Sequence, residues 1–208
     1  MKPFLLGVTG GIASGKSSVS RLLSSYCQVP LVDVDQCCRH LLEINQSGWL
    51  ALRAALGDSF FLQSGELDRS ALRERIFADA SIRWKVDTLL HPLARDAMRR
   101  EVAVCTAPWV LVEIPLLYEA GWQSDVDAVL VVYARRGAQC CRIMRRDGGT
   151  RKMAIQAITA QMNLGDKVKQ ADYVIDNSVR WSSAREQVIA LGIQLSERFS
   201  VKFCQESA

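Results

Sequence analysis

The chain has 208 residues, a hydrophobic fraction of 49% and a charged fraction of 23%, values that are typical of a folded globular protein and exclude a disordered or fibrous one. This length favours one α/β domain with an inserted helical region over two independent domains. The net charge of +4 is mild, and no base-stacking aromatic pattern accompanies the basic residues, so we expect a phosphate-rich small ligand and no nucleic acid.

The first motif in the chain is a glycine-rich turn between a predicted strand and a predicted helix. Residues 4–9 form an apolar run, and the segment after Lys16 has helical periodicity. The turn reads Gly10-x4-Gly15-Lys16-Ser17, a complete P-loop. Its backbone N–H groups would cradle phosphate oxygens, Lys16 would reach the β- and γ-phosphates, and the Ser17 hydroxyl would bind Mg²⁺ together with water. We expect nucleotide contacts from Gly11, Ile12, Ala13, Ser14, Gly15, Lys16, Ser17 and Ser18.

A second short strand is predicted at residues 28–33, and two carboxylates follow its apolar part. Asp33 and Asp35 stand at the carboxyl end of this strand, where open parallel sheets place ligands. Asp33 is the candidate for the general base that accepts the proton of an acceptor hydroxyl. A turn or helix-cap role is the alternative for Asp33, and for Asp35 an N-cap role is as good an interpretation as a catalytic one.

Residues 36–107 are predicted to be helical, a stretch far too long for a simple crossover between strands. Helices are expected at residues 49–56, 68–77 and 81–104, the last interrupted or bent at His91-Pro92. We interpret this stretch as a helical insertion that covers a substrate. His91 lies among leucines, where a packed histidine is commoner than a catalyst.

The remaining elements alternate between strand and helix. Strands are predicted at residues 109–114, 126–133 and 172–177, and helices at 139–146, 151–164 and 181–196; the last ten or so residues are expected to form a loose tail. The near-continuous apolar runs indicate strands covered on both faces, as in a parallel α/β sheet. Glu113 ends one of them, roughly in the position of a Walker-B carboxylate.

A basic cluster flanks the break at Gly148-Gly149. Its members are Arg142, Arg145, Arg146, Arg151 and Lys152. A lid that closes over a triphosphate and brings in arginines fits this composition. Since Arg142 and Arg146 share a helical face and Arg145 does not, part of the cluster is interpreted as ordinary surface charge.

The seven cysteines include two adjacent pairs and no Cys-x-x-Cys pattern. Vicinal pairs make poor disulfides and poor zinc sites, so we expect a reduced, cytoplasmic setting. No stretch is long enough to span a membrane, and no membrane partner is expected.

The ordered set of motifs resembles the bacterial dephospho-coenzyme A kinase family over about residues 4–195. The matching segments are 9–17 (T-G-G-I-x-S-G-K-S), Asp33 with Asp35 and Arg39, 69–77, 91–93 (H-P-L), 115–119 (P-L-L-Y-E), Arg142 with Arg146 and Asp147, Gln161, and 167–177. A P-loop alone is shared by many unrelated proteins, whereas this set is specific. One departure is Ala13, which stands where many members have Gly and is expected to be tolerated if its φ stays negative.

The resemblance implies the last step of coenzyme A synthesis, in which ATP with Mg²⁺ phosphorylates the ribose 3′-hydroxyl of dephospho-coenzyme A. It implies an α/β fold, a P-loop kinase core with a parallel five-stranded sheet flanked by helices, a helical substrate-binding insertion and a small lid. The core would comprise about residues 1–35, 108–140 and 170–200, the substrate region 36–107 and the lid 141–169. The chain is expected to be a monomer or a weak homo-oligomer.

Residue roles follow from the same resemblance. The implied catalytic residues are Lys16, Asp33 and Arg142, and Arg142 and Arg146 would bind ATP. The implied substrate-binding residues are Asp33, Asp35, Arg39, His91, Pro115, Leu116 and Leu117. A kinase for another small hydroxyl acceptor remains an alternative, because the core is shared. A GTPase switch is disfavoured, because the chain lacks an Asn-Lys-x-Asp motif.

Overall fold

The computed structural model describes residues 2–199 and contains one five-stranded sheet in the order β2-β3-β1-β4-β5. The strands are β1 (Phe4–Gly10), β2 (Leu31–Asp33), β3 (Trp109–Glu113), β4 (Ala128–Tyr133) and β5 (Tyr173–Asp176). β1 pairs in parallel with both β3 and β4, and β4 pairs in parallel with β5. The predicted parallel five-stranded α/β sheet is therefore confirmed. The tail predicted for the last ten or so residues lies outside the described residues.

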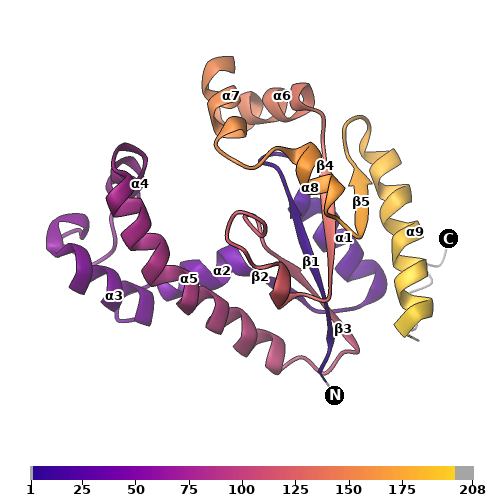
Figure 1. The fold of residues 1–208 in the computed structure, drawn as a ribbon, viewed down its shortest axis with the longest axis horizontal. Coiled ribbons are helices and arrows are strands. Elements are labelled where there is room, and N and C mark those ends of the chain that lie inside the picture. Colours follow the sequence, from indigo (N-terminus) through magenta and orange to yellow (C-terminus); the bar gives the residue numbers. More distant parts are fainter. Residues whose placement is uncertain (1, 200–208) are drawn as a thin grey trace. The chain divides into compact units, whose positions relative to one another are not determined.

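The sheet is covered on both faces, as its apolar strands require. All five residues of β3 and the first five of β4 are buried. Two helices, α1 (Lys16–Cys27) and α9 (Trp181–Phe199), lie side by side (Figure 1) and contribute to one apolar cluster with strand residues such as Leu6, Leu111 and Leu130. The short helix α8 (Leu164–Lys169) packs against β4. This burial, at about 25 cal/mol per Å² of apolar surface, is the main source of stability for the sheet.

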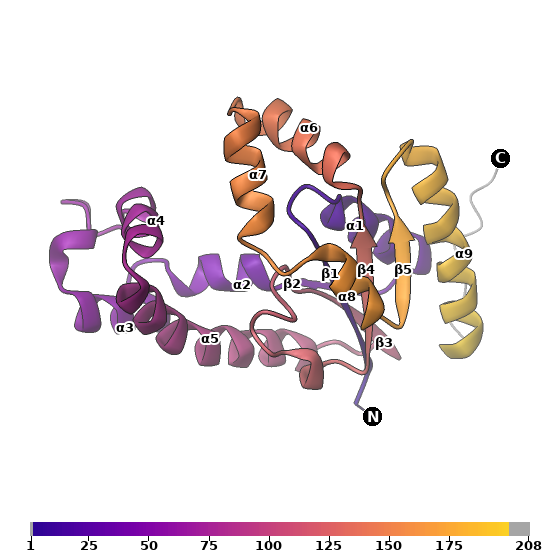
Figure 2. The same cartoon turned by 45° about the horizontal axis from the view of Figure 1, so that its top comes forward.

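Two further helices form a pair above the carboxyl edge of β4. α6 (Arg136–Asp147) and α7 (Arg151–Thr159) pack against each other (Figure 2). Gly148 ends α6 with φ of +68°, and the Thr150 side chain accepts a hydrogen bond from the Met153 N–H and so caps α7. Cys140, Ile143 and Ala154 form the buried seam of the pair.

The chain divides into two compact units, one containing the sheet and one comprising residues 33–103. The second unit is helical and covers most of the stretch that we expected to be an insertion. Its helices are α2 (Val34–Leu41), α3 (Ser47–Leu56), α4 (Arg69–Ala78) and α5 (Ala80–Ala103). Its core contains Leu52, Leu67, Leu72 and Val86. Among residues 2–199, no helix is both long and apolar enough to cross a membrane.

Two helix boundaries differ from the sequence-based expectation. The helix expected to be interrupted or bent at His91-Pro92 is not interrupted, because α5 runs from Ala80 to Ala103 with Pro92 inside it. Buried residues on both sides of the proline, Val86, Ala94 and Met98, give this helix a packed face, and packing of this kind offsets the hydrogen bond that a proline removes. The helix expected at residues 151–164 ends at Thr159, and α8 begins after Asn163, whose side chain accepts the Gly165 N–H at 2.8 Å.

Candidate active site

The P-loop joins β1 to α1 at the carboxyl edge of the sheet, as predicted. Gly15 has φ of +95° and precedes the first residue of α1, and a Cβ there would overlap the Asn177 side-chain amide. Only glycine fits this position. Gly15 provides no side-chain cap, and a helix N-terminus attracts an anion through its N–H groups and the positive end of the helix dipole.

Lys16 and Ser17 lie at the start of α1 with their side chains near the loop. The Lys16 Nζ atom donates to the Gly11 carbonyl at 3.3 Å, and the Ser17 Oγ atom donates to Glu113 Oε1 at 2.7 Å. Glu113 ends β3 and is only 4% exposed. A buried carboxylate beside a hydroxyl is a set of hard oxygen ligands, and these residues therefore fit a magnesium ion that takes its other ligands from phosphate and water.

Among the described residues, Ser17 and Glu113 are not part of a larger cluster of metal-binding side chains. Within residues 2–199, no group of three or more His, Cys, Asp or Glu side chains gathers in a way that could hold a metal ion. Magnesium in kinases commonly uses one or two protein oxygens plus substrate phosphates, so a sparse set is the arrangement expected here.

The backbone N–H and C=O groups of Ile12 are both hydrogen-bonded to glutamine side chains. Gln161 Oε1 accepts the Ile12 N–H at 2.7 Å, and Gln139 Nε2 donates to the Ile12 carbonyl at 2.7 Å. Both side chains line a cavity of about 390 Å³ beside the loop, together with Tyr133 and Leu164. Gln161 belongs to the motifs of the resemblance, and the structure adds its contact with the Ile12 N–H. No site role was predicted for Gln139 from the sequence. Its position one turn before Ile143 places a polar amide on the apolar face of α6, which is a sequence signal for a buried polar contact.

The carbonyl side of the loop is held by a second pair of side chains. Arg142 on α6 donates to the carbonyls of Ala13 at 3.3 Å, Ser14 at 3.4 Å and Asn177 at 2.7 Å. Asn177, which follows β5, donates from its side-chain amide to the Ser14 carbonyl at 2.8 Å. Arg142 therefore lies beside the P-loop, and its roles in catalysis and ATP binding stay predictions.

Arg146, the other predicted nucleotide-binding arginine, has a different partner. Its guanidinium donates twice to the Asp147 carboxylate, at 2.6 and 2.8 Å, and both side chains are exposed. This hydrogen bond raises the pKa of Arg146 and lowers the pKa of Asp147. Its role in ATP binding stays a prediction.

Ala13 departs from our expectation of a negative φ, because its φ is +55°. A residue with a side chain pays about 1–2 kcal/mol in this left-handed region. The neighbouring contacts of Ile12 and Ser14 with Gln139, Gln161, Arg142 and Asn177 are what hold the loop in this conformation.

The predicted acceptor-side residues lie partly in the helical unit. Asp33 is the N-cap of α2, where its Oδ1 accepts the N–H groups of Asp35 at 2.9 Å and Gln36 at 3.2 Å. The cap that we considered for Asp35 therefore belongs to Asp33. The Arg39 carbonyl accepts from the Arg69 guanidinium at 3.3 Å. His91 is on α5 of the same unit, 3.9 Å from the Asp87 carboxylate.

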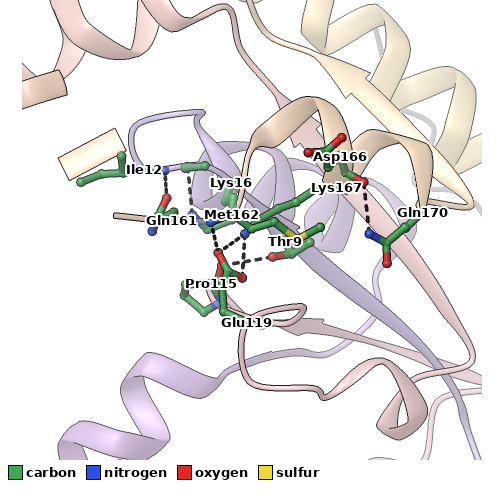
Figure 3. Close-up of polar contacts among 11 residues, drawn as sticks. Thr9, Ile12, Lys16, Pro115, Glu119, Gln161, Met162, Asp166, Lys167 and Gln170 are labelled. Carbon is green, nitrogen blue, oxygen red and sulfur yellow. Dashed lines mark hydrogen bonds and ion pairs between the residues drawn. The ribbon is translucent and has the colours of Figure 1, made fainter. Parts of the chain in front are cut away.

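The apolar turn after β3 belongs to the sheet unit. The Pro115 carbonyl accepts the Thr9 hydroxyl at 3.1 Å, which ties this turn to β1 (Figure 3). Leu117 is fully buried, whereas Leu116 is 45% exposed. Of the two leucines predicted to bind substrate, Leu116 is the one whose side chain reaches solvent.

A second ordered contact follows the same turn. Glu119 accepts the Met162 N–H at 3.0 Å and pairs with Lys167 of α8 at 2.8 Å (Figure 3). The side chain of Lys167 is completely buried. Two motifs quoted for the resemblance, 115–119 and 167–177, therefore meet in the structure next to Gln161.

Comparison with known proteins places the chain in one family. A family model described as dephospho-CoA kinase matches residues 4–182. A dephospho-CoA kinase of Carboxydothermus hydrogenoformans is 35% identical over 190 residues, which are 90% of this chain and 92% of the relative. A dephospho-CoA kinase of Geobacter sulfurreducens is 40% identical over 177 residues, covering 84% of this chain and 89% of the relative.

Solved structures share the fold of this chain. A crystal structure of a Thermus thermophilus protein has a TM-score of 0.81 and 31% identity, covering 95% of this chain and 98% of the other. A dephospho-CoA kinase from Campylobacter jejuni, at 22% identity, has a TM-score of 0.69 over 93% of this chain and 98% of the other and supports the fold. The chain therefore belongs to the dephospho-CoA kinase family. It is a kinase that uses ATP to phosphorylate dephospho-CoA, and this reaction is the last step of coenzyme A biosynthesis.

Proposed function

We propose that the P-loop of this chain binds ATP with Mg²⁺ and that Lys16, Asp33 and Arg142 transfer its γ-phosphoryl group to the ribose 3′-hydroxyl of dephospho-coenzyme A. The observation that supports this most directly is the Ser17–Glu113 contact of 2.7 Å beside Lys16 at the start of α1. It unites a phosphate-binding helix end with a hydroxyl and a buried carboxylate suited to a divalent cation.

Phosphoryl transfer depends on positioning and on neutralising charge around the γ-phosphate. The first N–H groups of α1 would hold phosphate oxygens, and Lys16 would exchange its bond to the Gly11 carbonyl for the β- and γ-phosphates. Ser17 and Glu113 would hold the magnesium ion, which supplies charge neutralisation and orients the triphosphate when bound. Arg142, beside the loop carbonyls, would add a guanidinium close to the phosphates.

Asp33 would orient the acceptor hydroxyl and take its proton. Both of its capping bonds use Oδ1, so we assign Oδ2 to the acceptor. The cap also fixes the side-chain rotamer, which is useful for a general base because proton transfer requires hydrogen-bond reach. Asp35, Arg39 and His91, and also Pro115, Leu116 and Leu117, are proposed to bind dephospho-coenzyme A.

The decisive experiment measures ADP release by the purified protein with Mg-ATP, with and without dephospho-coenzyme A, and the mass of the product. We expect acceptor-dependent ADP and a product heavier by one phosphoryl group, with the phosphate on the 3′-oxygen. Lys16→Ala is the matched control and should abolish transfer. If the folded protein binds ATP but the acceptor gives no stimulation, the acceptor assignment is wrong and a different small hydroxyl acceptor becomes the better proposal.

The setting of the enzyme is part of the same proposal. We propose a cytoplasmic location, which the six free thiols of the described residues support. We also propose a monomer or a weak homo-oligomer with ATP and dephospho-coenzyme A as its partners, and light scattering across a dilution series tests it.

A further inference from the structure

The P-loop contains one residue, Ile12, whose backbone N–H and C=O are both held by side chains from other elements. The Ile12 N–H is accepted by Gln161, which follows α7, and the Ile12 carbonyl receives a hydrogen bond from Gln139 on α6, both at 2.7 Å. Ala13, the next residue, has the unfavourable φ of +55°. A strained residue persists when its neighbours fix the backbone, and this pair of bonds does so immediately before it.

The residue after Gln161 is anchored to an ion pair (Figure 3). The adjacent Met162 N–H donates to Glu119 Oε1 at 3.0 Å, and Glu119 pairs with the buried Lys167 at 2.8 Å. The segment between α7 and α8 is therefore anchored on one side to the turn after β3 and on the other to the P-loop. Gln139 is only 3% exposed, and both glutamines also line the cavity beside the loop.

Resting on the proposed function, we propose that Gln161 is a positioning residue for nucleotide binding, which keeps the P-loop in its phosphate-binding conformation by accepting the Ile12 N–H. Gln139 adds a second hydrogen bond by donating to the Ile12 carbonyl. The Glu119–Lys167 pair sets the position of Gln161 through the neighbouring Met162 N–H. A loop that spends less time in the binding conformation binds ATP more weakly in proportion. One neutral hydrogen bond corresponds to an affinity change of about three- to tenfold.

The two glutamines act with opposite polarity, which makes the proposal specific. Gln161 has to accept, so Gln161→Glu keeps the bond and Gln161→Leu removes it. Gln139 has to donate, so Gln139→Glu replaces a donor by an acceptor and removes the bond at a similar side-chain size. Gln156 on α7 is exposed, and Gln156→Leu is the matched control for replacing a nearby glutamine.

The test is amide hydrogen exchange by NMR on the full-length, nucleotide-free protein, combined with ATP affinity by calorimetry. We expect Gln161→Leu to speed exchange of the Ile12 amide at least tenfold, to leave the β1 amides unchanged and to weaken ATP binding about three- to tenfold. Gln161→Glu should restore slow exchange at Ile12, and Gln156→Leu should match the unmodified protein.

Three outcomes would overturn the proposal. They are unchanged exchange at Ile12 in Gln161→Leu, faster exchange spread equally through β1, and failure of Gln161→Glu to restore protection. Exchange at Ile12 is measured without ATP or acceptor, so this test can fail or succeed whatever substrate the enzyme phosphorylates. If Gln161→Leu does not fold, Gln139→Glu removes the other side-chain hydrogen bond to Ile12. This variant should raise the ATP dissociation constant by about three- to tenfold.

Discussion

The Lys167 Nζ atom lies 2.8 Å from Glu119 Oε1, and the lysine side chain is completely buried whereas that of the glutamate is 22% exposed. This difference predicts unequal costs for breaking the pair. Glu119→Ala leaves a fully buried ammonium group without its partner and should lower the free energy of unfolding by about 3–5 kcal/mol. Lys167→Met leaves a carboxylate that water can reach and should cost less, about 1–3 kcal/mol.

Urea unfolding followed by circular dichroism measures both changes. The double variant Glu119→Leu with Lys167→Met is the control, because removing both charges together avoids an unpaired buried charge and should recover part of the loss. Equal losses in the two single variants would show that exposure of the partner does not govern the cost.

Asp33 combines a helix cap with a proposed catalytic role, and two substitutions separate them. Asn is as good an N-cap as Asp, so Asp33→Asn should keep stability and ATP binding but lower turnover by about 10²–10⁴, since it cannot accept the proton. Asp33→Ala should lose the cap as well and lower the free energy of unfolding by about 1 kcal/mol. Steady-state kinetics and urea unfolding check both effects, and a turnover loss of tenfold or less in Asp33→Asn would reduce Asp33 to positioning.

The fold and the loop could be predicted because their signals are local. The P-loop is a contiguous motif between a strand and a helix, and the apolar runs of β3 and β4 are long enough to identify a covered sheet. The side chains that hold the loop in place could not be predicted in the same way. Gln139 and Asn177 are more than 120 residues away from the loop in the sequence, and no spacing rule encodes such a contact.

Local rules also failed where two of them competed. Pro92 is a helix breaker by propensity, yet α5 continues through it. Two carboxylates, Asp33 and Asp35, were suitable caps for the same helix, and only the position where α2 begins decides that Asp33 takes the role. The sign of φ at Ala13 is likewise set by contacts with α6 and β5 neighbours rather than by the residue itself.

Ala13 should gain stability on replacement by glycine. Removing its Cβ relieves about 1–2 kcal/mol of left-handed strain, and the added freedom of the unfolded chain takes back about 0.4–1 kcal/mol. We expect Ala13→Gly to raise the free energy of unfolding by about 0.5 kcal/mol in urea unfolding. Gln28, with φ of +54° at the end of α1, is the control, and Gln28→Gly should give a similar gain. A loss in Ala13→Gly alone would show that packing of the Ala13 methyl group outweighs its strain.

Cys37 and Cys38 should be slow to react with alkylating reagents, because burial and nearby acidic groups raise the pKa of both thiols. Burial, followed by the Asp35 and Asp33 carboxylates, raises the pKa of Cys38 to about 11, whereas burial and Glu101 raise the pKa of Cys37 to about 12. The thiolate is the reactive form, so alkylation of both at pH 8 should be far slower than for an ordinary thiol. Asp35→Asn removes one of the charges near Cys38 and should lower its pKa, and therefore speed its alkylation without changing that of Cys37.

Peptide mass spectrometry of iodoacetamide reactions at several pH values measures both rates, with Cys37 as the internal control.

The raised pKa values of Cys37 and Cys38 also predict how the free energy of unfolding depends on pH. A thiol with a pKa higher in the folded protein than its ordinary value of 9.0 holds its proton more tightly when folded, so its stabilising contribution is complete below pH 9 and is lost as the pH rises through 11 to 12. The free energy of unfolding of the helical unit should therefore decrease as the pH rises through this range. In the Cys38→Ala variant the decrease should be less steep. An equal fall with Cys38→Ala would contradict a role for this thiol.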